Sequence, residues 1–140
     1  MIVGVIGSGG REHAICEFLN RSKKIKKLYC FPGNAGTAKI AINVEIDTND
    51  FEGFKDYVLM NKIGLLIVGP EKPLVDGIVD YFEKYNIKVF GPDKIAAQLE
   101  GSKIFTKKIC QKLKIPTAKF GIFQNKKDAK QYLENWNYPV

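Results

Sequence analysis

The chain has 140 residues, of which 45% are hydrophobic, 11% aromatic and 26% charged, values that are ordinary for a globular protein and exclude a wholly disordered chain. No apolar run approaches the roughly 20 residues that a membrane-spanning helix needs, so we expect no membrane partner. The formal net charge is +7, but the basic residues are almost all lysines spread along the chain, so we expect no nucleic-acid partner.

The beginning of the chain predicts a strand, a glycine turn and a helix. The apolar run at 2–6 is typical of a buried strand, and Gly7-Ser-Gly-Gly10 closes it. A helix should follow, because apolar residues recur at helical spacing at Ala14, Ile15, Phe18 and Leu19. We expect a second strand at 27–31, a loop at 32–37 and a third strand at 40–46.

The next stretch repeats this alternation. Asp47-Thr-Asn-Asp50 offers N-caps to a helix whose apolar face is Phe51, Phe54, Tyr57 and Val58. After a strand at 65–68, a single helix should bury Leu74, Val75, Ile78, Val79 and Phe82, and a fifth strand should follow at 87–90. Such alternation favours an α/β fold, a Rossmann-like parallel sheet of about five strands flanked by helices.

The pattern changes after about residue 100. Ser102 can cap a helix whose apolar face is Phe105, Ile109 and Leu113. Residues 119–123 predict a strand, and Asn125 can cap a last helix to about Asn135. Residues 138–140 are typical of the start of another strand. We therefore expect one domain at 1–101 and the incomplete beginning of a second at 102–140.

Four loops that follow predicted strands should meet at one edge of the sheet. They span residues 7–12, 32–37, 69–74 and 91–93, and each contains glycine or proline. Ligands of open parallel sheets bind beyond the carboxyl ends of the strands, where the strand order reverses. We expect the binding site at this edge.

The first loop, Gly7-Ser-Gly-Gly-Arg-Glu12, is similar to a dinucleotide-binding turn, whose glycines and helix N-terminus hold a diphosphate. The dinucleotide fingerprint nevertheless fails, because Glu12 stands where a third glycine is needed and no acidic residue ends the second strand. A phosphorylated small molecule fits better than NAD, and a tight turn without a ligand is the alternative.

The other polar candidates also have structural explanations. Asn34 and Thr37 could donate hydrogen bonds to a ligand or belong to a plain connecting loop. Glu71 could accept hydrogen bonds from sugar hydroxyls or an amine, or stabilise a helix N-terminus. Lys103 could meet an anion or lie in solvent, and His13 is favoured as a packing residue over a catalytic base.

Histidine, cysteine and carboxylate residues form no cluster with metal-ligand spacing, so no metal site is expected in this chain.

Cysteine usage and the N-terminal residues indicate the cellular compartment. Cys16, Cys30 and Cys110 are odd in number and far apart, which favours reduced thiols over disulfides. The first residues lack the basic region of a signal peptide, so we expect a cytoplasmic protein.

Four motifs together resemble one family. They are Val5-Ile-Gly-Ser-Gly-Gly-Arg-Glu-His-Ala14, Pro32-Gly-Asn-Ala-Gly-Thr37, Val68-Gly-Pro-Glu-Lys-Pro-Leu-Val75 and Phe90-Gly-Pro-Asp93, followed by Ala96-Ala-Gln-Leu-Glu-Gly-Ser-Lys103. In this order the chain is similar to the N-terminal part of the phosphoribosylamine–glycine ligases (glycinamide ribonucleotide synthetases), a family of ATP-grasp ligases. The resemblance covers essentially the whole chain.

The resemblance implies a longer enzyme, with a Rossmann-like substrate domain at 1–101 and an ATP-grasp domain that begins at 102. Such an enzyme joins glycine to phosphoribosylamine, via glycyl phosphate, while ATP becomes ADP and phosphate, and the product glycinamide ribonucleotide serves de novo purine synthesis. The implied partners are these small molecules, and no obligate protein partner is implied. Besides ATP, the implied cofactor is Mg²⁺ or Mn²⁺, with ligands beyond residue 140.

The resemblance also implies roles for individual residues. Phosphoribosylamine would be faced by Gly9, Gly10, Arg11 and Glu12, and the same cleft would be lined by Asn34, Gly36 and Thr37. Glu71 would hold the ribose hydroxyls or orient the amine, beside a wall formed by Pro73 and Leu74. Lys103 would reach toward a nucleotide phosphate. No catalytic residue is implied within this chain, so the 140 residues alone should be inactive; the alternatives are another ATP-grasp ligase or a non-catalytic sugar-phosphate-binding module.

Overall fold

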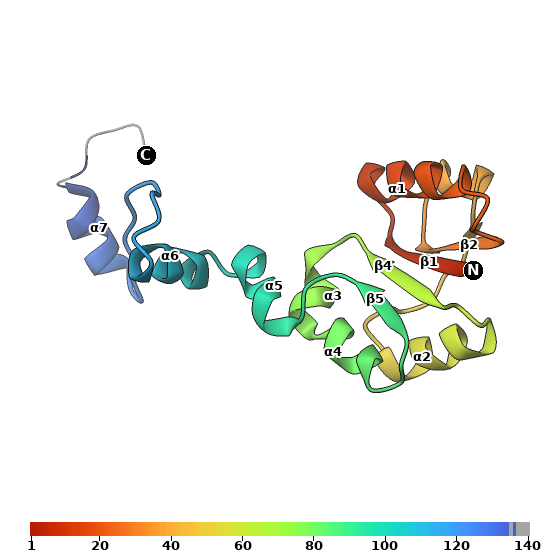
Figure 1. The fold of residues 1–140 in the computed structure, drawn as a ribbon. Helices are drawn as coiled ribbons and strands as arrows, with labels where there is room; N and C mark the ends of the chain where they lie inside the picture. Colours follow the sequence, from red (N-terminus) through yellow and green to blue (C-terminus); the bar gives the residue numbers. More distant parts are fainter. Residues whose placement is uncertain (135, 137–140) are drawn as a thin grey trace. The chain divides into compact units, whose positions relative to one another are not determined.

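Five parallel strands form the centre of the first part of the molecule (Figure 1). The computed structural model describes residues 1–134 and 136, and the chain divides into two units, Met1–Gly101 and Ser102–Val140. The strands of the first unit are β1 (Ile2–Gly7), β2 (Lys27–Pro32), β3 (Ile42–Asn43), β4 (Leu65–Val68) and β5 (Lys88–Phe90). Their order is β3-β2-β1-β4-β5, which confirms the predicted five-stranded parallel sheet.

Helices cover both faces of this sheet (Figure 1). On one face, α1 (Gly10–Asn20) packs its Cys16 against Val3, Val5, Leu28 and Cys30. On the other face, α2 (Phe51–Met60) and α4 (Ile78–Glu83) contribute Phe54 and Phe82 to a larger core around Phe31 and Leu66. Each face thus buries apolar side chains that alternate along the strands, which is the main source of stability in such a sheet.

The apolar face of α1 differs from the prediction. Phe18 is 74% exposed, and its ring lies 5.5 Å from the guanidinium carbon of Arg21. The helix instead faces the sheet with Glu12 and Cys16, and with the partly buried Ile15 and Leu19 beside them. A glutamate at a core position disguises the helical period, because a carboxylate is not counted among apolar residues.

Two predicted elements of the first unit are shorter than expected. The third strand covers only residues 42–43, because the 3₁₀ turn η1 (Thr37–Lys39) and its hydrogen bond from Ala41 N–H to Thr37 O (2.8 Å) occupy the preceding residues. The single helix predicted after β4 is two helices, α3 (Glu71–Asp76) and α4. Gly77 divides them with a φ of 99°, a left-handed conformation that ends α3.

A helix that the sequence did not predict, α5 (Lys94–Gly101), closes the first unit and contacts α3. Asp93 Oδ1 accepts a hydrogen bond from Ala96 N–H (2.7 Å), so an aspartate after β5 caps this helix. Its Ala97 is buried, whereas Ile95 and Leu99 are exposed, so the apolar residues do not mark one core face.

The second unit contains α6 (Lys103–Lys112) and α7 (Lys126–Glu134). Ser102 Oγ accepts from Phe105 N–H (3.2 Å) and Asn125 Oδ1 from Asp128 N–H (3.0 Å), as the predicted caps require. The strand predicted at 119–123 is wrong, since these residues form a loop whose Phe120 carbonyl accepts from the Tyr132 hydroxyl (3.2 Å). A strand needs a pairing partner, and the described residues of this unit supply none. The strand predicted at 138–140 lies outside the described residues.

Within residues 1–134 and 136, no helix is both long and apolar enough to cross a membrane. The three cysteines are free thiols, with Cys16 and Cys30 completely buried. Both lie in the core between α1 and the sheet, where a hydrogen bond with Cys30, together with burial, raises the pKa of the Cys16 thiol.

Candidate functional site

The reversal of strand order places the candidate site at the ends of β1 and β4. From β1 the chain continues to β2 and β3 on one side, whereas β4 and β5 lie on its other side. The connections after β1 and β4 therefore leave the sheet toward opposite faces, and ligands of parallel sheets bind at such a point. The turn that begins with Gly7 and the segment that begins with Gly69 come together there, since Gly69 N–H donates to Ile6 O (3.0 Å).

The side chain of Glu12 is buried at this point. The residue is only 4% exposed, although it follows directly on the glycine turn. Its Oε2 accepts a hydrogen bond from Gly9 N–H (2.7 Å), and its Oε1 accepts from Arg11 Nε (3.2 Å). The carboxylate therefore fills the role of an anion at the N-terminus of α1, where the helix dipole favours negative charge.

Three glycines make room for this carboxylate. A Cβ added to Gly7 would lie 2.6 Å from Glu12 Cγ, and one added to Gly69 would lie 2.6 Å from Glu12 Cδ. A Cβ on Gly9 would lie 2.9 Å from Glu12 Oε2. Gly7 also has a φ of 127°, a backbone angle that residues other than glycine rarely adopt. The close approach of the Glu12 side chain therefore explains all three glycines, in addition to the curvature that the turn after β1 requires of Gly7 and Gly9.

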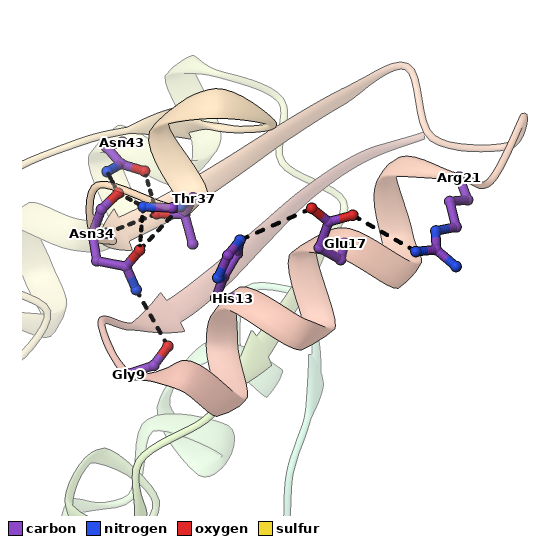
Figure 2. Close-up of polar contacts among 8 residues, drawn as sticks. Gly9, His13, Glu17, Arg21, Asn34, Thr37 and Asn43 are labelled. Carbon is purple, nitrogen blue, oxygen red and sulfur yellow. Dashed lines mark hydrogen bonds and ion pairs between the residues drawn. The ribbon is translucent and has the colours of Figure 1, made fainter.

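Asn34 holds the loop after β2 in place (Figure 2). Its Oδ1 accepts hydrogen bonds from Gly36 N–H (2.7 Å) and Thr37 N–H (3.0 Å), and its Nδ2 donates to Ser8 O (2.8 Å) and Gly9 O (3.3 Å). One side chain thereby joins the loop after β2 to the glycine turn after β1. All of these contacts lie within the protein, so Asn34 positions the site's backbone.

Thr37 and Asn43 complete this network (Figure 2). Thr37 is fully buried, and its hydroxyl lies 2.8 Å from Asn43 Oδ1 and accepts from Asn34 N–H (2.7 Å). Asn43 Nδ2 in turn donates to Asn34 O (2.8 Å). Asn43 is not among the residues predicted from the sequence, and the available signal was a lone side-chain amide within the predicted strand at 40–46.

His13 lies beside this loop on α1. A Cβ added to Gly36 would lie 2.5 Å from the imidazole Cε1, so the glycine lets the ring pack directly on the loop. Nε2 of His13 lies 3.9 Å from Glu17 Oε1, and Glu17 Oε2 lies 3.9 Å from Nη2 of Arg21 (Figure 2). The arrangement supports the packing role favoured for His13.

The segment after β4 contributes a different kind of surface. Glu71 is the first residue of α3 and its side chain is exposed, whereas Pro73 and Leu74 are buried. Leu74 packs against the start of the loop after β5, where a Cβ on Gly91 would lie 2.5 Å from Leu74 Cδ2. Pro73 and Leu74 therefore fix α3, and Glu71 is an exposed group of this segment that a ligand could reach, next to the exposed Lys72.

Lys103 belongs to the second unit. It is the first residue of α6, directly after the Ser102 cap, and it is exposed. Among residues 1–134 and 136, no group of three or more histidine, cysteine, aspartate or glutamate side chains could hold a metal ion.

A parallel sheet whose first strand ends in a glycine turn at the point of strand reversal defines a Rossmann-like α/β domain. The family described as "Phosphoribosylglycinamide synthetase, N domain" matches residues 1–100, and the chain belongs to this family.

Individual relatives agree with this assignment. The phosphoribosylamine–glycine ligase of Caldanaerobacter subterraneus subsp. tengcongensis is 49% identical over 140 residues, which are all of this chain and 34% of the relative. The crystal structure of phosphoribosylamine–glycine ligase from Thermotoga maritima has a TM-score of 0.71 and 27% identity, and the match covers 98% of this chain and 31% of that one.

A more distant structure shares the fold alone. N5-carboxyaminoimidazole ribonucleotide synthetase from Thermus thermophilus has a TM-score of 0.69 at 17% identity, with 99% of this chain and 37% of that chain covered. The chain spans about a third of the length of the ligases that it matches.

Proposed function

We propose that the chain is the N-terminal part of a phosphoribosylamine–glycine ligase and contains most of the phosphoribosylamine site. The observation that carries this proposal is the 49% identity to such a ligase over all 140 residues. The four motif segments support it, because each one follows a strand of the same parallel sheet.

The reaction explains why one domain must hold the amine substrate in place. Glycine's carboxylate is a poor electrophile until it takes the γ-phosphoryl group of ATP and becomes glycyl phosphate, with release of ADP. The amine of phosphoribosylamine then attacks the carbonyl carbon and phosphate leaves, which gives glycinamide ribonucleotide. Correct placement of the amine and exclusion of water favour this attack over hydrolysis of the acyl phosphate.

The geometry of the first unit supports roles for these residues that the family resemblance also implies. The turn of Gly9, Gly10, Arg11 and Glu12 would face phosphoribosylamine, and Glu71 would accept hydrogen bonds from its hydroxyls or amine. Gly36 would line the same cleft, while Asn34 and Thr37 would hold the loop in shape from within. Pro73 and Leu74 would support Glu71 by anchoring α3.

The nucleotide half of the site would lie mainly outside this chain. We propose that residues 102–140 begin an ATP-grasp domain in which Lys103 reaches toward a phosphate of ATP. The Mg²⁺ or Mn²⁺ that such enzymes use would be held by residues of the full-length ligase beyond 140. The 140 residues alone would not catalyse the reaction, and the full-length enzyme would act in the cytoplasm.

A chimera tests this proposal. Residues 1–140 would replace the matching segment of the Caldanaerobacter ligase, and formation of glycinamide ribonucleotide would be measured with glycine, ATP and phosphoribosylamine. The chimera should be active, and Glu71→Gln should lower kcat/KM for phosphoribosylamine by about tenfold, with little effect on the KM for ATP. Glu83→Gln, an exposed carboxylate at the end of α4, is the matched control.

A folded chimera without activity, beside an active unaltered Caldanaerobacter enzyme, would contradict the proposed function. Equal effects of Glu71→Gln and Glu83→Gln would contradict the role of Glu71 alone. Turnover by the isolated 140-residue chain would contradict its proposed inactivity.

A further inference from the structure

The glycine turn after β1 differs by one residue from a dinucleotide-binding turn. Gly7 and Gly9 hold the first two glycine positions of the G-x-G-x-x-G pattern, and Glu12 holds the third. In dinucleotide-binding domains this turn receives a diphosphate at the N-terminus of the following helix, beside the end of the first strand. What Glu12 does at this position therefore decides which ligands the turn accepts.

The Glu12 side chain points into the protein and not into solvent. Its side chain is 6% exposed and is enclosed by Gly7, Gly9 and Gly69, from the ends of β1 and β4. The carboxylate also accepts a hydrogen bond from Gly9 N–H, which is a backbone donor of the kind that such a turn offers to a phosphate. The protein's own anion thus already takes the Gly9 N–H, which an incoming diphosphate would otherwise use.

The charge of Glu12 adds repulsion to this steric block. A second anion near the carboxylate would be poorly screened, because the carboxylate is almost completely buried. Arg11 donates to Oε1 from a side chain that is 61% exposed, so it compensates the carboxylate from the solvent side.

We propose that Glu12 is a specificity-determining residue that closes the diphosphate position of this turn. It excludes dinucleotides and nucleoside diphosphates from the point of strand reversal and leaves that point to ligands that present hydrogen-bond donors, such as hydroxyls or an amine. The proposal depends on the geometry of the turn and does not depend on the proposed ligase activity.

The test removes first the charge and then the side chain. Binding of inorganic pyrophosphate and of ADP to the 140-residue chain would be measured by calorimetry for the unaltered protein, Glu12→Gln and Glu12→Ala. We expect at least tenfold tighter binding of both probes to Glu12→Ala, and an intermediate gain for Glu12→Gln, which keeps the size of the side chain. Glu17→Gln makes the same charge change at a half-exposed position of α1 and should leave binding unchanged.

Amide NMR spectra locate the binding. The probes should shift the resonances of Gly9 and Gly69 in the Glu12 variants, and the same spectra show whether each variant is folded. The proposal is overturned if the folded Glu12 variants bind the probes no more tightly than Glu17→Gln does, or if the shifts lie elsewhere. If Glu12→Ala does not fold, Glu12→Gln alone decides between these outcomes.

Discussion

Buried polar side chains, and not exposed ones, shape the candidate site at the level of single residues. Glu12 and Thr37 are nearly or fully buried, and each satisfies backbone groups of the turn in which it lies. Unpaired polar groups are costly in a protein interior, so removing one such side chain leaves several backbone donors or acceptors without partners.

Asn34 offers a direct measurement of this cost. Asn34→Ala should lower the free energy of unfolding by about 1–3 kcal/mol, because Gly36 N–H, Thr37 N–H and Ser8 O lose their side-chain partner, whereas Gly9 O keeps its bond from His13 N–H. Chemical denaturation of the 140-residue chain would measure the change. Asn20→Ala, at the exposed end of α1, is the control, and equal losses for the two variants would show that the network does not stabilise the loop.

The sequence predicted which residues gather at the site better than it predicted what they do there. Gly9, Asn34 and Glu71 were chosen because they follow predicted strands, and the parallel sheet places all three after strand ends. The inward orientation of Glu12 was not predictable, because it depends in part on Gly69, which is distant in sequence, and that of Asn34 depends on the carbonyls of Ser8 and Gly9. A linear pattern carries no record of that approach.

Among the secondary-structure elements, short strands with a clear apolar run were the most predictable. The strand at 65–68 was predicted with its observed bounds, whereas the break at Gly77 and the helix α5 were not foreseen. Apolar residues on either side of Gly77 keep helical spacing, so periodicity alone joins α3 and α4. The wrong strand at 119–123 has the same cause, since periodicity cannot reveal whether a pairing partner exists.

The junction between α3 and α4 depends on its glycine. Gly77→Ala should destabilise the protein by about 1–2 kcal/mol, because the residue has a φ of 99° and its N–H caps α3 at Pro73 O and Leu74 O. Gly10→Ala is the contrasting variant: an added Cβ meets nothing within 4 Å, and alanine in a helix gains up to about 1 kcal/mol over glycine. Thermal unfolding would compare the two, and a stable Gly77→Ala protein would contradict the dependence on glycine.

A polar contact joins α2 to α4 and should make stability depend on pH. Hydrogen bonds from Lys55 and then from Tyr81 hold the pKa of Glu52 below its usual value of 4.5. A lowered pKa in the folded state contributes stability above that usual value, and the contribution is lost as the pH falls through the folded-state pKa. Glu52→Gln should therefore flatten the decline in melting temperature below about pH 4.5.

The matched control for this pH dependence is Glu45→Gln, an exposed carboxylate in the segment before α2. Melting temperatures from about pH 6 to about pH 3 would be measured for both variants and the unaltered chain. Parallel curves for Glu52→Gln and the unaltered chain would show that neither the Lys55 nor the Tyr81 hydrogen bond of Glu52 contributes to acid stability.

At the scale of the whole molecule, the core lies entirely in the first unit. Both clusters of buried residues fall within 1–97, and no described residue after 101 is buried. Because hydrophobic burial is the main stabilising contribution, a chain of residues 1–101 should unfold cooperatively, with a melting temperature close to that of the 140-residue chain. Circular dichroism would measure both, and a fragment without a cooperative transition would contradict the independence of the first unit.

The position of β1 in the middle of the sheet has a consequence for synthesis on the ribosome. Residues 3–6 emerge well before residues 65–68 of β4, with which they pair on one side. A nascent chain that has reached only β2 and β3 therefore keeps one edge of its central strand open, next to apolar residues that have nothing to cover them. Chaperone capture of this protein should be strongest in that interval and should decline once β4 leaves the exit tunnel.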